Sequence, residues 1–530
     1  MSRYQFSFAE RIGYENSPDI TVPIALYTDV SFGIPIAAKL DCGSTLCVFQ
    51  RKFGEILGLD VESGILQWIR RRLNLSQNMR AIPTLKISIS GVRGVIGDSL
   101  TPTLLTRFAQ AFGTYVGSGA IVIGRDTRTS GEMVRQAVIA GLLSSGCRVI
   151  DLDICPVPTV QLIVRQRHAQ GGVAITASHN PAEWNALKFI NSEGLFLSAG
   201  QARELLDIYH QGDYTKVAGA EMRGVEPLTV ALDAHINAII SSAGALPQSS
   251  RKLKVALDSC NGAGSVVAPQ LIEALGAEVI AINTTPDGSF PRGAEPTPEN
   301  ITRLCQLVKE SGADVGFAQD MDADRLAVVD ETGAPIGEDY TLALAARYVL
   351  GKTPGEVVTN LSTTSAMDDV ARMFNCPLHR SKIGEANVTE MMRQVGAVIG
   401  GEGNGGVIYP RVNFCRDSLV GMALILHLLA ETGRTVTELL ADLPRYKMIK
   451  EKLECPSDKI GEILKAVRDE YAGRRMDLRD GVKIIFEDAW LHVRGSNTEP
   501  IVRLVVEARD EARARRILNG VFERVAHVLR

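Results

Sequence analysis

Residues 253–282, LKVALDSCNGAGSVVAPQLIEALGAEVIAI, contain the pattern that decides the fold class. We expect an apolar strand at Leu253–Leu257, a polar turn at 258–262, and a helix that leads to a second strand at Glu278–Ile282. The same order recurs from Ala120–Gly124 to Cys147–Asp151, and from Glu356–Thr359 to Pro377–Arg380. Strand–helix–strand units of this spacing form right-handed parallel crossovers. The sequence therefore predicts an α/β protein with three similar mixed α/β domains.

The C-terminal end follows a different pattern. Polar and apolar residues alternate in Lys483–Phe486, Trp490–Val493 and Ile501–Glu507, as in antiparallel strands, and Asp510–Arg530 has one apolar helical face. This predicts a fourth, smaller α+β domain, and residues 1–78 read as a short β-rich extension. The predicted boundaries are 1–78 for the extension, 79–230 for domain I, 231–335 for domain II, 336–440 for domain III and 441–530 for domain IV.

The composition excludes several classes of protein. Lys plus Arg number 57 and Asp plus Glu number 61, which gives a net charge of −4 and no basic footprint for nucleic acid. No apolar run approaches the ~18 residues of a membrane span, and the N-terminus has no hydrophobic signal region. The nine cysteines form no Cys-x-x-Cys pair, which is typical of reduced thiols. We expect a cytoplasmic protein with no membrane or nucleic-acid partner, either a monomer or a homodimer.

Two polar loops follow apolar strands and offer reactive groups. Thr176–Pro181, TASHNP, would expose the Ser178 hydroxyl at a strand end, although a simple Ser or Asx turn also explains it. Asp320–Arg325, DMDADR, carries three alternating carboxylates, which share one face of an extended stretch and repel one another unless a cation lies among them. Oxygen-only ligands favour Mg²⁺ over zinc; the alternative is a solvated acidic turn.

Two further loops suit a phosphosugar. Gly401–Gly406, GEGNGG, lets the backbone approach a ligand while Glu402 and Asn404 offer groups that read hydroxyls or an amine, although ordinary glycine turns look alike. Arg494–Pro500, RGSNTEP, with Arg503 beyond it, suits a phosphate dianion, although a polar hairpin is the alternative. A hydroxyl, a carboxylate trio, a sugar-reading loop and a phosphate clamp on four domains together indicate phosphoryl transfer on a phosphosugar held in a cleft between the domains.

From about Met79 to Arg530 this set of loops resembles the α-D-phosphohexomutase family. The motifs that carry the resemblance are SISGVRG at 88–94, GRDTR at 124–128, and the four loops TASHNP, DMDADR, GEGNGG and RGSNTEP in that order. The resemblance implies three mixed α/β domains and a smaller C-terminal domain around one central cleft.

The resemblance also implies roles for particular residues. Ser178 would carry a phosphoryl group, and Asp320, Asp322 and Asp324 would hold Mg²⁺ together with the phosphate on Ser178. The sugar would be read by Glu402 and Asn404, and the phosphate that does not react would be held by Arg494, Ser496, Asn497, Thr498 and Arg503. Arg93 and Lys188 match basic residues near the transferred group, with Lys188 a candidate general base or acid. His179 joins them as a catalytic candidate, and Arg325 is expected to contact the phosphoserine region and the substrate.

We therefore expect a phosphohexomutase that interconverts hexose or hexosamine 6-phosphates and 1-phosphates through a phosphoserine and a 1,6-bisphosphate. Mg²⁺ and hexose 1,6-bisphosphate would be its cofactor and activator. The details look most like phosphoglucosamine mutases of an archaeal-like type, with phosphoglucomutase or phosphomannomutase as the alternative. Met321 stands where the family usually has Gly, Asn404 and Gly406 stand where many members have Ser and His, and Glu385 lies near a loop where some relatives use His.

Residues 24–64 contain Asp41-Cys42-Gly43-Ser44, which resembles the active-site loop of retropepsin-like aspartic proteases with Cys42 in the Thr place. Such proteases pair two aspartates and need a later glycine-bearing strand, which is missing before Met79. An inactive remnant or a mis-set translation start is the favoured interpretation. A dimeric aspartic protease fusion and a non-catalytic sugar-phosphate binder are the alternatives to the mutase.

Overall fold

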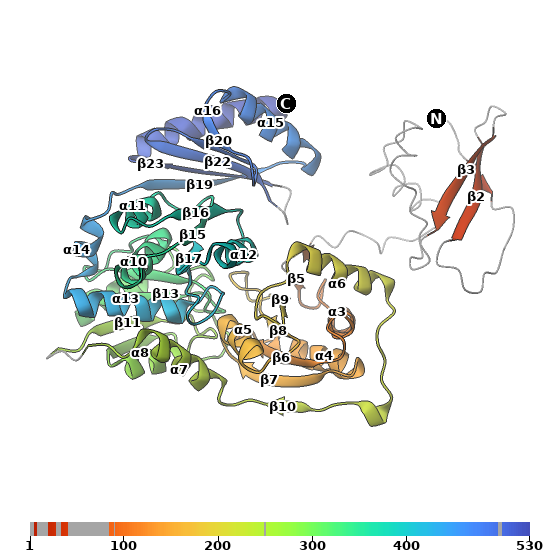
Figure 1. Cartoon of the computed structure of the whole chain (residues 1–530), viewed down its shortest axis with the longest axis horizontal. Helices are drawn as coiled ribbons and strands as arrows, with labels where there is room; N and C mark the ends of the chain where they lie inside the picture. Colours follow the sequence, from red (N-terminus) through yellow and green to blue (C-terminus); the bar gives the residue numbers. More distant parts are fainter. Residues whose placement is uncertain are drawn as a thin grey trace. The chain divides into compact units, whose positions relative to one another are not determined.

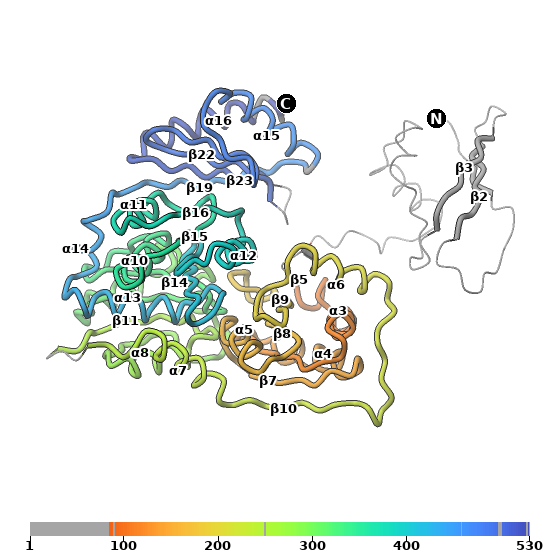
Figure 2. Tube along the Cα trace, in the orientation of Figure 1, coloured from red at the N-terminus to blue at the C-terminus, as the bar shows by residue number. Residues whose placement is uncertain are grey.

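The computed structural model describes residues 5–7, 20–27, 33–40, 84–88, 91–247, 251–496 and 501–529. Figure 2 traces the chain through those from Thr84 onward. Two compact units are distinguished, one with the described residues before Thr84 and residues 204–214, the other with Thr84–Arg203 and Thr215–Arg530. In the first unit β1 (Gln5–Ser7), β2 (Ile20–Tyr27) and β3 (Gly33–Leu40) pair antiparallel in chain order. The protease-like residues Asp41 to Ser44 lie outside the described part of the chain.

Domain I is built on a mixed seven-stranded sheet of order β10-β7-β6-β8-β9-β5-β4 (Figure 1). Its strands are β4 (Lys86–Ser88), β5 (Gly91–Val95), β6 (Ala120–Arg125), β7 (Arg148–Ile154), β8 (Gly171–Ile175), β9 (Trp184–Asn191) and β10 (Val225–Pro227). Its helices are α3 (Pro102–Tyr115), α4 (Gly131–Ser144), α5 (Val157–Gln166) and α6 (Ala199–Gln211), followed by the short η1 (Gly219–Glu221) and by α7 (Ala231–Ala243), which leads to the next sheet. Strands β7, β6 and β8 run parallel, whereas β9 turns back antiparallel to β8.

Domains II and III repeat this arrangement with four strands each, in the orders β12-β11-β13-β14 and β16-β15-β17-β18. The elements of domain II are β11 (Lys254–Asp258), α8 (Val267–Leu275), β12 (Glu278–Ile282), α9 (Thr302–Ser311), β13 (Val315–Gln319) and β14 (Leu326–Val329). Those of domain III are α10 (Glu338–Lys352), β15 (Val357–Asn360), α11 (Ala366–Met373), β16 (Leu378–Ser381), α12 (Glu385–Val395), β17 (Ile399–Glu402), β18 (Gly406–Ile408), α13 (Ser418–Thr432) and α14 (Val436–Ala441).

The three sheets share one topology, which confirms the predicted triple α/β repeat. In each, two helical crossovers make three parallel strands, and a fourth strand returns as an antiparallel hairpin. The loops with Ser178, with the three aspartates and with Glu402 occupy the same position, the hairpin between the third and fourth strands. The third strand is buried along its whole length in all three sheets, so its neighbours fix where the hairpin begins.

Domains II and III share one hydrophobic core around α10 and α13. Twelve of the fifteen residues of α13 are buried, including His427. Within the described residues, no helix combines the length and the apolar character that crossing a bilayer requires. Domain II and domain III therefore hold their two loops on a common framework.

Domain IV is the predicted α+β domain, an antiparallel sheet of order β19-β23-β22-β21-β20 with α15 and α16 packed together against it (Figure 1). Its elements are β19 (Lys447–Glu454), η2 (Ser457–Lys459), α15 (Ile460–Glu470), β20 (Arg475–Asp477), β21 (Val482–Ile485), β22 (Ala489–Gly495), β23 (Ile501–Ala508) and α16 (Glu511–Leu529). Its own apolar core lies between the two helices and the sheet.

Candidate active site

Ser178 lies at the tip of the β8–β9 hairpin, where it is only 4% exposed. Its backbone is in the left-handed region, with φ of 49°, which aims the side chain out of the line of the strand. The hydroxyl of Thr176 fixes this conformation by accepting a hydrogen bond from the Ser178 N–H at 2.9 Å and by donating to Asp126 at 2.6 Å. The Ser178 Oγ donates to Oδ2 of Asp320 at 3.4 Å. The structure therefore brings the hydroxyl to the loop Asp320–Arg325, called the acidic loop below.

Arg128 fixes the Ser178 loop through hydrogen bonds to its backbone carbonyl groups. Its guanidinium is fully buried, pairs with Asp126 at 3.0 Å, and donates to the backbone carbonyls of Ser178 and Asn180, each at 2.7 Å. It also donates to the carbonyls of Pro181 and Trp184. One buried side chain thus donates to four carbonyl groups of this turn, which holds the turn in place.

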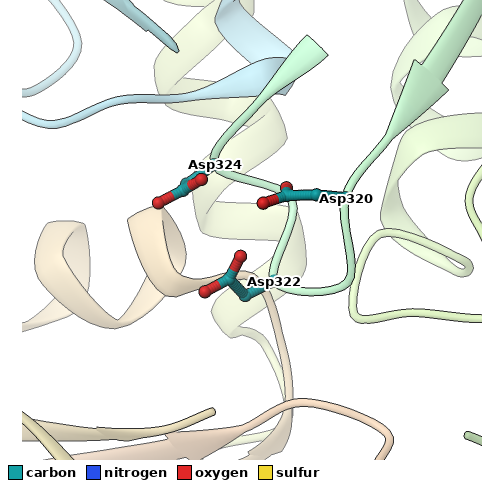
Figure 3. Close-up of side chains that lie close together, drawn as sticks. All are labelled: Asp320, Asp322 and Asp324. Atoms are coloured by element: carbon teal, nitrogen blue, oxygen red, sulfur yellow. The ribbon is translucent and has the colours of Figure 1, made fainter. Parts of the chain in front are cut away.

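The carboxylates of Asp320, Asp322 and Asp324 converge between β13 and β14, as Figure 3 shows. They are at most 1% exposed, and one oxygen of each lies within 4.8 Å of the others. Oδ1 of Asp322 and Oδ1 of Asp324 are buried without a hydrogen-bond partner. Unpaired buried carboxylate oxygens are costly, so their convergence fits a hard divalent cation, for which oxygen is the preferred ligand.

The acidic loop is supported on its backbone side. The Met321 carbonyl accepts from Ala263 N–H at 2.8 Å, and the Ala323 carbonyl accepts from the Ser418 hydroxyl at 2.6 Å. Gly262 packs so closely that a Cβ atom there would lie 2.7 Å from the Met321 carbonyl oxygen. Met321, where the family usually has Gly, is itself buried, and its sulfur contacts Arg128 at 3.2 Å.

Electrostatics in the loop reflect crowding of like charges. Burial and the neighbouring carboxylates of Asp322 and Asp324 raise the pKa of Asp320 well above its ordinary value. Burial acts in the same direction on Asp322, but the Lys188 ammonium, 2.7 Å from its Oδ2, outweighs it and lowers the pKa of Asp322. Besides Lys188, Arg325 and Arg416 also face this loop, 3.6 Å and 2.6 Å from the Asp324 carboxylate, so cations surround the three aspartates.

The basic candidates gather around these two loops. Lys188 reaches Asp322 from the middle of β9, and Arg93 on β5 donates from Nη1 to Oδ1 of Asn180. Arg325 pairs with Glu295 at 3.0 Å and lies 3.6 Å from Asp324. Positive charge thus gathers around the Ser178 and Asp320–Arg325 loops.

His179 differs from the other candidates because its ring faces cations. Burial, and after it the nearby Arg325, lowers the pKa of His179 to about 4. Nδ1 is buried without a hydrogen-bond partner. A neutral imidazole at this position suits a hydrogen-bonding role near the phosphoryl group better than a charged one.

Glu402 ends β17 and is 3% exposed. Its Oε1 accepts from the Asn360 amide and the Gly384 N–H, both at 2.9 Å, and its Oε2 accepts from Arg416 at 2.9 Å. Asn404 caps the turn by accepting from the Gly406 N–H at 3.2 Å. The sugar loop meets the acidic loop through a hydrogen bond from Leu326 N–H to the Gly405 carbonyl at 3.0 Å.

The predicted phosphate clamp lies on the central strands of domain IV. Arg494 and Arg503 are directly opposite each other on β22 and β23, and Lys452 lies opposite Arg503 on β19. Like charges in such cross-strand positions repel unless an anion lies near them. Arg494 also pairs with Asp480 at 3.3 Å, and Ser496 follows at the strand end, while Asn497 and Thr498 lie outside the described residues.

Sequence reasoning assigned no role to four residues that organise this site, of which only Arg416 went unnoticed altogether: Asp126, Arg128, Glu385 and Arg416. The first two belong to the GRDTR motif, which was noted only as part of the resemblance. Glu385 begins α12, and burial raises its pKa to about 7. No local pattern marks Arg416, and only its neighbour Asp417, the N-cap of α13, could have drawn attention to this loop.

Comparison with known proteins agrees with these observations. Family models described as phosphoglucomutase/phosphomannomutase match the chain as α/β/α domain I at residues 85–216, domain II at 233–333, domain III at 337–446 and the C-terminal domain at 449–524. The protease-like resemblance falls outside all four matches.

Individual relatives cover most of the chain. A "probable phosphoglucosamine mutase" of Methanopyrus kandleri is 39% identical over 432 residues, which are 81% of this chain and 95% of the relative. A "phosphoglucomutase/phosphomannomutase" of Thermococcus kodakarensis is 38% identical over 436 residues, with the same coverage of 81% and 95%. The crystal structure of a phosphoglucomutase/phosphomannomutase family protein from Burkholderia thailandensis superposes with a TM-score of 0.74 at 26% identity, over 84% of this chain and 97% of that one. The chain therefore belongs to the phosphoglucomutase/phosphomannomutase family, the α-D-phosphohexomutases, which are isomerases that act as intramolecular phosphotransferases on sugar phosphates.

Proposed function

We propose that the protein interconverts glucosamine 6-phosphate and glucosamine 1-phosphate through a phosphorylated Ser178. The observation that carries the proposal is the position of the Ser178 hydroxyl, buried on a strained turn 3.4 Å from Asp320 and beside three converging carboxylates. A serine hydroxyl is a weak nucleophile, but its phosphate ester is a good phosphoryl donor where charge is neutralised.

Asp320, Asp322 and Asp324 are proposed to hold Mg²⁺ together with the Ser178 phosphate. The ion, when bound, would neutralise charge on the transferring phosphoryl group. Around it, the hydrogen bonds from Arg128 fix the backbone of the Ser178 loop, and Arg325 and Arg93 add donors for the phosphoryl oxygens. These fixed donors lower the barrier because they need no rearrangement during the reaction.

Two transfers complete the exchange. In the first, the bond from phosphorus to Ser178 Oγ breaks and a bond to the sugar 1-oxygen or 6-oxygen forms, which gives a 1,6-bisphosphate. The Lys188 ammonium is proposed to give its proton to Ser178 Oγ as it leaves and to be restored by the proton of the attacking sugar hydroxyl. The bisphosphate then turns over in the cleft, and its other phosphoryl group returns to Ser178.

Domain IV is proposed to hold whichever phosphate does not react. Arg494, Ser496, Asn497, Thr498 and Arg503 supply its donors, with Lys452 extending the cationic row. Glu402 and Asn404 are proposed to read the sugar between the two phosphate positions. Because the same clamp must accept either end of the intermediate, recognition rests on groups common to both orientations.

The preference for the amino sugar rests on the charge of the sugar loop. Glu402 and Glu385 are both buried there, and they share one arginine. A 2-ammonium group would pair with a carboxylate here better than a 2-hydroxyl would, and the Methanopyrus kandleri relative carries the corresponding name. The name of the Thermococcus kodakarensis relative makes phosphoglucomutase/phosphomannomutase activity the second candidate function.

Turnover on three substrates tests the proposal. Purified protein with Mg²⁺ and a trace of hexose 1,6-bisphosphate would be assayed on the 6-phosphates of glucosamine, glucose and mannose. We expect kcat/KM to be highest for glucosamine 6-phosphate and to vanish in Ser178→Ala. A preference for mannose or glucose 6-phosphate would refute the substrate assignment, and full activity of Ser178→Ala would refute the phosphoserine.

A further inference from the structure

Arg416 lies between β18 and α13 and binds three carboxylates from different parts of the fold. Its Nη2 is 2.6 Å from Oδ2 of Asp324, its Nη1 is 2.9 Å from Oε2 of Glu402, and its Nε is 2.9 Å from Oε2 of Glu385. The side chain is 11% exposed, so these are desolvated, charge-assisted contacts. One guanidinium thus joins the acidic loop of domain II to the sugar loop of domain III.

Gly406 and Asp417 allow the Arg416 side chain to reach its three carboxylates. A Cβ atom on Gly406 would lie 2.3 Å from Cδ of Arg416, so only a glycine at 406 permits the arginine stem to pass. The following residue, Asp417, caps α13, and its Oδ2 accepts a hydrogen bond from Nε2 of the buried His235 at 2.8 Å, which fixes the backbone that carries Arg416.

The contacts orient each loop differently. On Asp324 the arginine takes Oδ2 and leaves Oδ1 without a hydrogen-bond partner, 3.6 Å from Nε of Arg325. On Glu402 it takes Oε2, while Oε1 is fixed by Asn360 and by the backbone. Because Arg416 is the partner of both carboxylates, movement of either one disturbs the contact that holds the other.

We propose that Arg416 is a positioning residue that sets Asp324 for the cation and Glu402 for the sugar at the same time. The inference rests on the proposed function, since it assumes that the acidic loop binds Mg²⁺ and that Glu402 faces the sugar. Its consequence is that loss of the forked geometry weakens both sites together, although the two loops belong to different domains.

Arg416→Lys separates geometry from charge, because an ammonium keeps the charge but cannot bridge three carboxylates in fixed directions. Mg²⁺ affinity of the unphosphorylated protein would be measured calorimetrically without sugar, and KM for the phosphosugar would be measured at saturating Mg²⁺. Loss of such a supporting contact typically costs about 10- to 100-fold. We expect both constants to weaken by about that factor, with a smaller change in kcat at saturation of both ligands.

Arg372→Lys is the matched control, because Arg372 is 72% exposed and pairs with Asp369 in the same helix. It should leave both constants unchanged. A change in only one constant of Arg416→Lys, or in neither, would overturn the inference. Inactivity of the wild-type protein on every phosphosugar would instead overturn the proposed function, while the Mg²⁺ affinities would still test the acidic-loop half.

Amide hydrogen exchange measures the coupling between the two loops without depending on turnover. Addition of Mg²⁺ alone to wild-type protein should slow amide exchange in residues 401–406 as well as in 320–325, and Arg416→Lys should reduce the effect on 401–406. If Arg416→Lys does not fold, the wild-type experiment still decides, because unchanged exchange in residues 401–406 would contradict coupling between the loops.

Discussion

Replacing Arg128 by methionine should leave the buried carboxylate of Asp126, beneath the Ser178 loop, without its ion-pair partner. The guanidinium is fully buried, and Asp126, 1% exposed, would lose its partner at 3.0 Å. Removing one member of a buried ion pair typically costs about 3–5 kcal/mol. The carbonyls of Ser178 and Asn180 would lose their donor as well. We therefore expect domain I of Arg128→Met to be destabilised by about 4 kcal/mol at pH 8, with a large loss of kcat.

The loss should depend on pH in a defined direction. Burial already raises the pKa of Asp126 above its ordinary value despite Arg128, and removing the arginine raises it further. A carboxyl whose folded pKa is raised favours folding at low pH and loses that contribution as pH rises through the folded pKa. The deficit of Arg128→Met should thus shrink between pH 8 and pH 5.

Urea unfolding followed by tryptophan fluorescence, in a background where Trp68 and Trp490 are replaced by phenylalanine so that Trp184 reports alone, measures this deficit at each pH. The control is Arg148→Met, which breaks an exposed pair at 3.7 Å and should cost no more than about 1 kcal/mol at any pH. The double variant Arg128→Met/Asp126→Asn should be less destabilised than the sum of the single variants. A deficit below about 1 kcal/mol, or one that does not vary with pH, would refute the reasoning.

Three further predictions follow from the same contacts. Asp320→Asn should weaken Mg²⁺ binding by at least about 10-fold, measured by calorimetry; unchanged affinity would mean that the ion binds elsewhere. Gly262→Ala should weaken Mg²⁺ binding without touching a carboxylate, because its Cβ would press on Met321 and displace the acidic loop; normal affinity would show that the loop tolerates the shift. Burial lowers the pKa of His492 to about 4, so the stability that it contributes is present above pH 6.5 and is lost as pH falls toward 4. His492→Gln should therefore lose less stability than wild type between pH 6.5 and pH 4.5 in thermal melts, and an equal loss would contradict this assignment.

The chemistry-bearing loops could be predicted from the sequence because each is a short polar break after an apolar strand. Thr176–Pro181 and Asp320–Arg325 are contiguous, so spacing alone places their reactive groups on one turn. The repeated strand–helix–strand order also predicts where those turns lie, since equivalent strands end at equivalent edges of the three sheets. Local pattern thus accounts for the fold class and for the parts of the site that sit on single loops.

The residues that hold the loops in place could not be found in this way. Arg128 meets the Ser178 carbonyl across 50 residues of sequence, and Arg416 meets Asp324 across 92. The first pair depends on which strands become neighbours within one sheet, and the second on how two sheets pack. A single arginine has no local signature that distinguishes a buried bridge from a solvated side chain. Burial and distance in the folded chain are what distinguish them.

Transfer of labelled phosphate tests the central claim most directly. Protein incubated with Mg²⁺ and glucose 1,6-bisphosphate carrying ³²P would be digested, and the labelled peptide identified by mass spectrometry. The account predicts label on Ser178 that is discharged to an added hexose 6-phosphate, with no label retained by Ser178→Ala. Label on another residue, or steady turnover by protein that never acquires phosphate at Ser178, would contradict it.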